Sequence, residues 1–149
     1  MAERKVASLI LLAAVIGLIV GSIGTYAIMQ WTAKISSRAQ LKLVGVGVYK
    51  DINFSLPVTE IDWGVVEPSE TKNFSAYLKN ESNVPISLSM YVENWNPPSA
   101  SSFIALSWNC EASHVNIGGS LPVTFTLNVS ASTAGFANFN FTIVIVGSG

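Results

Sequence analysis

The chain has few charges and few chemically reactive side chains. Charged residues make up 11% of its 149 residues, and the net charge is −1. With so few charges the chain has no basic face that could neutralise phosphates, and we do not expect nucleic acid as a partner. The single cysteine, Cys110, excludes a disulfide within the chain. The polar surface must come from Ser, Thr and Asn, 38 residues together, a composition typical of secreted and cell-surface β domains.

Catalytic and metal-binding patterns are also missing. His114 is the only histidine and lies four residues after Cys110, with Glu111 as the one other nearby ligand type. A metal site needs three or four ligands, and a Cys–His nucleophile pair needs a third, orienting group. Asp62 and Glu67 are too isolated for paired-carboxylate chemistry. The sequence therefore predicts no enzyme, no cofactor, no metal site and no small-molecule substrate.

One long apolar stretch is present, residues 6–29, with 24 residues and no charge. As a helix it would be about 36 Å long, enough to cross a hydrocarbon core of about 30 Å. Arg4 and Lys5 precede it, as in a secretory signal or a signal anchor. A signal peptide would be cleaved between Ala27 and Ile28. The stretch exceeds the 7–15 apolar residues typical of a signal peptide, which favours an uncleaved anchor.

Small residues recur every four positions within this stretch, at Ala13, Gly17 and Gly21. On a helix they share one face, which would let a second helix approach closely. The alternative is that the segment is simply rich in Ala and Gly, as many anchors are. A prepilin-type leader is a third alternative, although Val6 follows Arg4 and Lys5 where such leaders have Gly or Ala.

The rest of the chain has a period of two instead of a helical period. We expect a linker or extended arm over residues 30–40 and an extracytoplasmic domain over residues 41–149. The expected fold is all-β, an immunoglobulin-like antiparallel β-sandwich of about seven strands, preceded by the N-terminal hydrophobic helix. Strands 71–79 and 86–92 alternate most strictly, and we expect them to form an antiparallel hairpin. The other expected strands cover residues 41–49, 61–66, 103–108, 121–129 and 139–145.

N-glycosylation triplets are more frequent than chance, which would give about two among eleven asparagines. Most fall on the outward phase of an expected strand or in a turn, where a glycan would not disturb the core. The alternative is that polar strands contain such triplets without use. Their placement suits a domain outside the cytoplasm, with the N-terminus inside and the C-terminus outside. The five candidates are Asn53, Asn73, Asn80, Asn128 and Asn140.

Residues 24–90 resemble the TasA and camelysin family and the related archaeal bundling pilins. GTYA (24–27) is similar to the end of the leader, and QLKL (40–43) to the first strand. VEPSETKNFSAYLKNESNVPISLSM (66–90) resembles the family's turn, strand, asparagine-rich turn and strand. LSWN (106–109) and SLPVTFTLNVS (120–130) are similar to small archaeal surface β-sandwich domains.

This resemblance implies subunits that polymerise when the N-terminal arm of one completes the sheet of the next. The arm would be residues 28–38, freed by cleavage after Ala27. An added strand satisfies the open main-chain groups of a sheet edge. The alternative is a juxtamembrane linker with Trp31 at the membrane interface. The candidate donor residues are Ile28, Met29, Trp31, Ala33 and Ile35.

Taken together, the sequence predicts a structural or adhesive cell-surface protein, either anchored in the membrane or assembled into filaments. The expected partners are membrane lipid, through the N-terminal helix, and copies of the chain or other surface proteins. An alternative is an accessory binding domain that holds an S-layer or a filament base. That alternative predicts an exposed aromatic patch around Trp95, next to Pro97 and Pro98.

Overall fold

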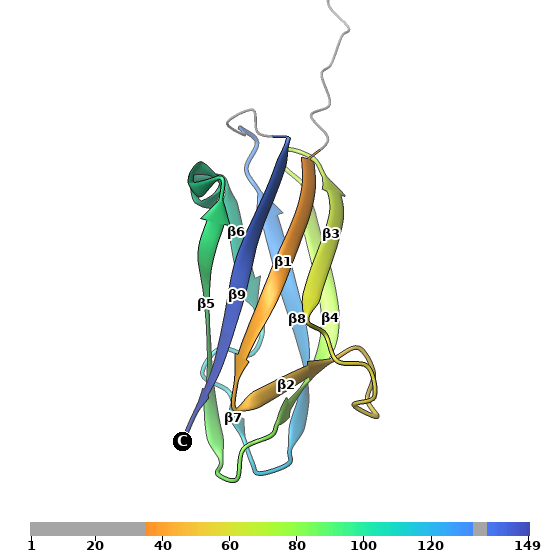
Figure 1. The fold of residues 1–149 in the computed structure, drawn as a ribbon, viewed down its shortest axis with the longest axis vertical. Helices are drawn as coiled ribbons and strands as arrows, with labels where there is room; N and C mark the ends of the chain where they lie inside the picture. Colours follow the sequence, from red (N-terminus) through yellow and green to blue (C-terminus); the bar gives the residue numbers. More distant parts are fainter. Residues whose placement is uncertain (1–34, 133–136) are drawn as a thin grey trace, which may run out of the picture. The chain divides into compact units, whose positions relative to one another are not determined.

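The computed structural model describes residues 35–132 and 137–149, which form two β-sheets (Figure 1). The all-β sandwich is confirmed. Several predicted features lie outside the described residues. These are the expected helix with its packing residues Ala13, Gly17 and Gly21, the cleavage point between Ala27 and Ile28, and the arm residues Met29, Trp31 and Ala33. Sheet A has the order β3 (Glu60–Val66), β1 (Ile35–Val44), β9 (Asn138–Ser148), β5 (Ile86–Asn96) and β7 (His114–Val115). Sheet B has the order β2 (Val46–Tyr49), β4 (Thr71–Asn80), β8 (Ser120–Val129) and β6 (Ile104–Trp108).

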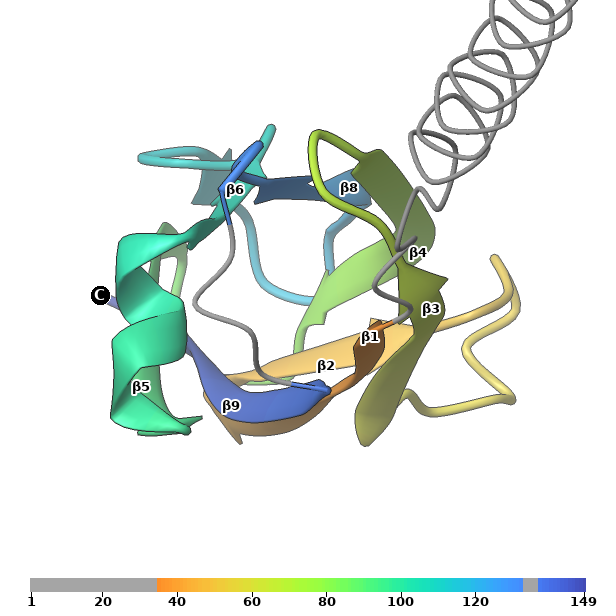
Figure 2. The same ribbon diagram turned by 90° about the horizontal axis from the view of Figure 1, so that it is seen from above.

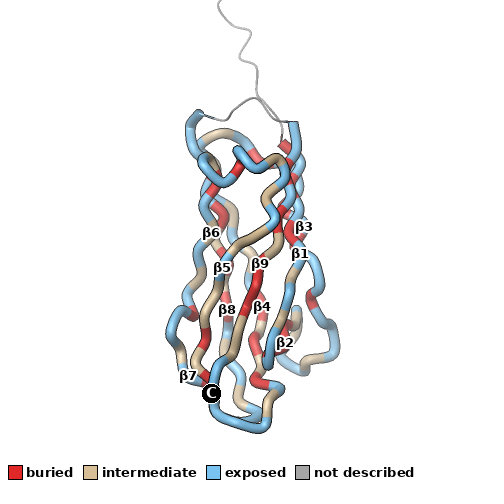
Figure 3. Tube along the Cα trace, turned by 60° about the vertical axis from the view of Figure 1, so that its left-hand side comes forward, coloured by how far each residue is buried: buried red, intermediate tan, exposed pale blue. Residues whose placement is uncertain are grey.

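A hydrophobic core lies between the two sheets. Figure 2 shows β1 and β9 on one side of it and β6 and β8 on the other. In β8, Phe125 and Leu127 point inward with no exposed surface, and Ile143 and Ile145 do the same in β9. The side chains alternate because successive residues of a strand face opposite sides of the sheet. Red segments along β9 in Figure 3 mark its buried residues, which include Ile143 to Ile145 in succession.

The structure contradicts the expected hairpin of β4 and β5. β4 pairs with β2 and β8 in sheet B, whereas β5 pairs with β7 and β9 in sheet A. The connection between them therefore crosses from one sheet to the other. Alternation of apolar residues predicts which face of a strand is buried, but it carries no information about which strand lies alongside. In the described residues, no two strands that are consecutive in the sequence are neighbours in a sheet.

The expected linker over residues 30–40 is wrong from Ile35 onward. Ile35 begins strand β1, and the side chains of Ile35 and Ala39 have no exposed surface. Between them Ser37 is also buried and donates a hydrogen bond from Oγ to the Gly64 carbonyl oxygen (3.3 Å). Two of the inward positions are thus a serine and an alanine. Because these residues are only weakly hydrophobic or polar, the sequence shows no clear alternation from which this strand could be predicted.

The single strand expected over residues 41–49 is two strands in two sheets. Gly45 separates β1 from β2 and has φ +71°, a left-handed conformation that glycine adopts without strain. The chain leaves sheet A at this glycine and enters sheet B with Val46. Gly47 permits a second close approach, because a Cβ atom there would lie 2.5 Å from the Tyr49 ring.

The sandwich also departs from the expected antiparallel pattern and strand number. β1 and β9 run parallel, with nine aligned pairs from Ser36 and Asn138 to Val44 and Val146. The described residues form nine strands instead of about seven. The two additional strands are β2 and β7, with four and two residues, too short to give a periodic signal. The 3-10 helix η2 (Pro98–Ser102) follows β5.

Candidate functional site

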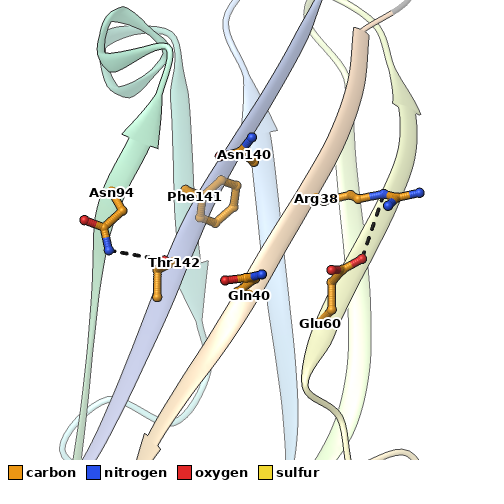
Figure 4. Close-up of a pocket in the computed structure, with 7 residues that line it drawn as sticks. All are labelled: Arg38, Gln40, Glu60, Asn94, Asn140, Phe141 and Thr142. Atoms are coloured by element: carbon orange, nitrogen blue, oxygen red, sulfur yellow. Dashed lines mark hydrogen bonds and ion pairs between the residues drawn. The ribbon is translucent and has the colours of Figure 1, made fainter.

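A polar hollow of about 410 Å³ lies on the outer face of sheet A, and we call it the sheet A hollow. Its lining comes from four neighbouring strands, β3, β1, β9 and β5 (Figure 4). No local sequence pattern predicts this hollow, since its residues are spread over more than one hundred positions of the chain. The lining residues are Arg38, Gln40, Glu60, Asn94, Asn140, Phe141 and Thr142.

Strand register places these side chains together. Arg38 aligns with Asn140 of β9, and Gln40 aligns with Glu60 of β3 and with Thr142 of β9. On the β5 side the pairing is irregular between residues 93 and 96, and Asn94 has φ +57°. This bulge directs the Asn94 side chain toward β9, where Nδ2 donates to Thr142 Oγ1 at 3.4 Å.

The charges at the hollow nearly balance. Arg38 Nε lies 3.8 Å from Glu60 Oε1 and 3.7 Å from Asp62 Oδ2. The Arg38 side chain is 66% exposed, so water and salt screen these ion pairs and their contribution to stability is small. They hold the guanidinium toward β3, at the β3 side of the hollow (Figure 4). A second hollow of about 270 Å³ shares Arg38 and Asn140 with the first.

Four of the five predicted glycosylation asparagines are exposed. Asn53 lies in the loop before β3, and Asn73 points outward from β4. Asn128 points outward from β8 and accepts a hydrogen bond at Oδ1 from Thr71 Oγ1 (2.8 Å). Asn140 points outward from β9 into the sheet A hollow. The four are distributed over both sheets and a loop, and the structure does not bring them together.

The prediction for Asn80 is wrong. This residue ends β4 and is 1% exposed, because it continues the inward phase of that strand. Nδ2 donates to the carbonyl oxygens of Val84 (2.8 Å), Val115 (3.1 Å) and Asn116 (3.2 Å). Oδ1 accepts from the backbone N–H (2.8 Å) and hydroxyl (2.7 Å) of Ser82. A glycan on Nδ2 would break these bonds and has no room in the folded domain.

The outer edge of β3 is protected by a charged side chain. Lys72 lies on the inward phase of β4, and its Nζ donates to the carbonyl oxygens of Trp63 (3.0 Å) and Val65. Gly64, with φ +67°, adds a bulge to the same strand. Inward-pointing charges and bulges both prevent an edge strand from pairing with another chain.

We expect Lys72→Ala to increase self-association, because two edge carbonyls of β3 lose their donor and the edge loses its charge. Size-exclusion chromatography with light scattering would detect the larger species. Lys79→Ala is the matched control on the same strand, since Lys79 lies over the Phe54 ring, 4.9 Å from its centroid. Identical elution of the two variants would contradict this role of Lys72.

The other three edges differ in their protection. β7 has only two residues. The loop after β2 folds over that strand, and Val58 N–H donates to the Val48 carbonyl oxygen (2.8 Å). β6 is the longest of these three edge strands, with five residues, and pairs only with β8 among the described strands. An incoming strand would therefore find its least protected edge at β6.

The only cysteine and the only histidine are not brought together in a site. Cys110 is 1% exposed, and its Sγ lies 3.6 Å from the Pro122 carbonyl oxygen, whereas His114 is exposed on β7. Glu111 accepts a hydrogen bond from Trp108 Nε1 (2.7 Å). No group of three or more His, Cys, Asp or Glu side chains that could hold a metal ion occurs within residues 35–132 and 137–149.

Burial raises the pKa of the Cys110 thiol to about 11. At pH 8 the thiol is thus neutral and shielded, and we expect it to react with a disulfide reagent only when the protein unfolds. A spectrophotometric thiol assay in buffer and in urea would measure this difference. Rapid labelling of the native protein at pH 8 would contradict the buried position.

The aromatic patch expected around Trp95 is also wrong. Trp95 is half-buried, and its ring stacks on that of Phe141 with centroids 4.5 Å apart and planes at 28°. Because it packs against the core, it offers little aromatic surface to a partner. The exposed aromatic patch that an accessory binding domain would present around Trp95 is therefore absent from the described part of the chain.

Comparison with known proteins gives no assignment, since no family model and no curated protein matches the chain. Within the described residues, no helix has the length and apolar character needed to cross a membrane. The apolar stretch of residues 6–29 lies outside the described residues.

Proposed function

We propose that this chain is a non-enzymatic structural or adhesive protein of the cell surface, an immunoglobulin-like β-sandwich held outside the membrane by its N-terminal apolar helix. One observation carries the proposal. Only residues 30–34 separate the apolar stretch from β1, and β1 lies within sheet A between β3 and β9. A membrane or partner that binds the N-terminal stretch is thereby connected through the chain to a central strand of sheet A.

The surface of the sandwich supports the same proposal. Asn53, Asn73, Asn128 and Asn140 are exposed in N-x-S/T triplets, as an extracytoplasmic domain permits. With the sandwich outside, the N-terminus lies in the cytoplasm. The proposed partners are membrane lipid, through residues 6–29, and further copies of this chain or other surface proteins.

Assembly into filaments by strand donation is the second form of the proposal, and the structure changes its expected details. The arm assigned to residues 28–38 overlaps β1 from Ile35 onward. We therefore propose that the donated strand is β1 itself, exchanged between copies. Gly45 supplies the pivot, because rotation there would move β1 out of sheet A while β2 stays in sheet B.

N-terminal sequencing of the native protein separates the anchored and released forms. A start at Met1 or Ala2 would support the uncleaved anchor, and a start at Ile28 would support a released or polymerising subunit. A start at Val6 or Ala7 would support the prepilin-type leader. Recovery of the full-length protein in the cytosolic fraction, free of membrane, would contradict the proposal.

A cysteine pair tests the exchange of β1. Ser36 and Asn138 are aligned on β1 and β9 and both are exposed, so Ser36→Cys with Asn138→Cys should form a disulfide in a Cys110→Ser background. Exchange predicts disulfides between chains, visible as a ladder on a non-reducing gel. Ser75→Cys with Thr124→Cys is the control, since these residues pair within sheet B and should form only intrachain bonds. Monomers alone from the first pair would refute β1 exchange and leave the anchored form.

A further inference from the structure

Two of the exposed glycosylation candidates lie at hollows. Asn128, whose Oδ1 already accepts a hydrogen bond from Thr71 Oγ1, lines a hollow of about 320 Å³ beside β6 and β8. The other is Asn140. It lines both hollows on the outer face of sheet A, so a group attached to its Nδ2 would extend directly into one of them. Asn73, by contrast, lines neither hollow and projects from the outer face of sheet B. The chain therefore offers a matched pair of exposed strand asparagines, one at a hollow and one away from it.

The lining of the sheet A hollow has the hydrogen-bonding groups that sugar hydroxyls require. Arg38 supplies several N–H donors, Glu60 supplies acceptors, and the amides of Gln40 and Asn94 supply both. Thr142 adds a hydroxyl beside them. No hydrogen bond is found for the Gln40 and Asn140 side chains among the described residues, so their amides are open to a ligand.

Charge and size narrow the class of ligand. Arg38 is paired with Glu60 and Asp62, so the hollow lacks the excess positive charge that a phosphate would need, and it has no cluster of carboxylates for a cation. Its volume of about 410 Å³ suits a small organic group, since such pockets span about 300–1,000 Å³. A neutral, hydroxyl-rich ligand fits these properties best.

We propose that the sheet A hollow is a carbohydrate-binding site that holds the first sugars of a glycan attached to Asn140. This inference rests on the proposed placement of the sandwich outside the cytoplasm. The triplet Asn140, Phe141 and Thr142 supplies three of the lining residues, so the modified segment also forms part of the site. Arg38 and Gln40 of β1 and Asn94 of β5 would contact the sugar from either side of β9.

The test compares the full chain from a host that glycosylates N-x-S/T triplets with the full chain from a host that does not. Mass spectrometry identifies the modified asparagines, and thermal unfolding gives the Tm of each form. We expect Asn140→Gln to lower the Tm of the glycosylated protein by about 4 °C or more and to leave the unmodified protein nearly unchanged. Asn73→Gln should change neither form by a comparable amount.

Arg38→Ala with Gln40→Ala separates sugar contact from a merely structural role. If these side chains hold the glycan, the double variant lowers the Tm of the glycosylated form more than that of the unmodified form. An equal loss in both forms would refute the contact. An Asn140 that stays unmodified in the glycosylating host, together with binding of the released glycan to the hollow, would place the sugar's source elsewhere and would overturn the attachment.

The modification pattern distinguishes failure of this inference from failure of the proposed function. If Asn73 carries a glycan and Asn140 does not, the carbohydrate-binding site is refuted and the extracytoplasmic placement stands. If no asparagine is modified and the full chain is still found in the membrane fraction, the carbohydrate-binding site is refuted and the placement stands. Recovery of the unmodified full chain in the cytosolic fraction refutes both.

Discussion

Replacing Asn80 with alanine is expected to lower the free energy of unfolding by about 3 kcal/mol. The side chain is 1% exposed and shares its two amide protons among three backbone carbonyl oxygens, those of Val84, Val115 and Asn116. These carbonyls lie at one end of the sandwich, that of Val84 in the turn after β4, that of Val115 at the end of β7 and that of Asn116 in the turn after β7. In the alanine variant these partly buried carbonyl oxygens lose their hydrogen-bond donor. Leaving a buried acceptor unpaired destabilises the folded state by more than the hydrogen bond itself contributes. Equilibrium urea unfolding, followed by tryptophan fluorescence, measures the loss.

Asn73→Ala is the control, because Asn73 is an exposed asparagine on the same strand and also begins an N-x-S triplet. Its effect should stay within about 0.5 kcal/mol of the unmodified protein, as for most surface substitutions. Equal stability of the two variants would mean that the Asn80 amide does not connect the two turns. Mass spectrometry of the glycosylated chain adds a second check, since Asn80 should carry no glycan in the folded protein.

Ile35→Ala is expected to destabilise the sandwich by about 2–5 kcal/mol. The Ile35 side chain has no exposed surface and packs in the core at the start of β1. Truncation removes apolar contacts and leaves a cavity that the surrounding sheets fill only in part. The result also decides the role of this segment, because a linker or free arm would tolerate alanine at this position without loss.

Ser36→Ala controls for position, since Ser36 is the exposed neighbour of Ile35 on the same strand. We expect it to change the free energy of unfolding by less than about 0.5 kcal/mol. Differential scanning calorimetry of both variants would show whether Ile35 belongs to a buried strand or to a linker. Indistinguishable melting of Ile35→Ala and the unmodified protein would restore the linker assigned from the sequence.

Strand faces could be predicted from the sequence, whereas strand partners could not. In β4 the inward residues Phe74, Ala76 and Leu78 are half-buried or buried, and they alternate with more exposed polar residues. The same pattern holds in β8, from Val123 to Leu127. Alternation depends on the local geometry of one strand, so it survives in any sheet. The pairing of β4 with β8 instead of β5 depends on residues some 50 positions apart, for which the chain has no local signal.

The burial of Asn80 could have been predicted from the sequence. Two positions after the inward Leu78, period two places Asn80 inward as well. The Asn-x-Ser spacing also matches a turn in which the asparagine oxygen binds the N–H two residues on, as it does here with Ser82. The N-x-S triplet suggested an exposed glycan acceptor at a position where the strand phase indicated a buried one.

The sheet A hollow could not have been predicted in this way. It depends on the parallel alignment of Arg38 with Asn140 and on a bulge that turns Asn94 toward Thr142. Both features come from long-range register, and β1 itself was not recognised between residues 35 and 40. A strand whose inward residues are Ile35, Ser37 and Ala39 gives little hydrophobic contrast.

The parallel pairing of β1 and β9 has a mechanical consequence. Because the two strands point the same way, the first residue of β1 and the last residue of β9 lie at opposite ends of the pair (Figure 1). A pull between these two residues acts along both strands, so the hydrogen bonds of nine aligned pairs are loaded in shear at the same time. A pull between Val44 and Val146, at one end of the pair, would instead peel the bonds apart one after another. Tension between the start of β1 and the end of β9 would therefore load the sandwich in the direction in which its central strands resist separation most.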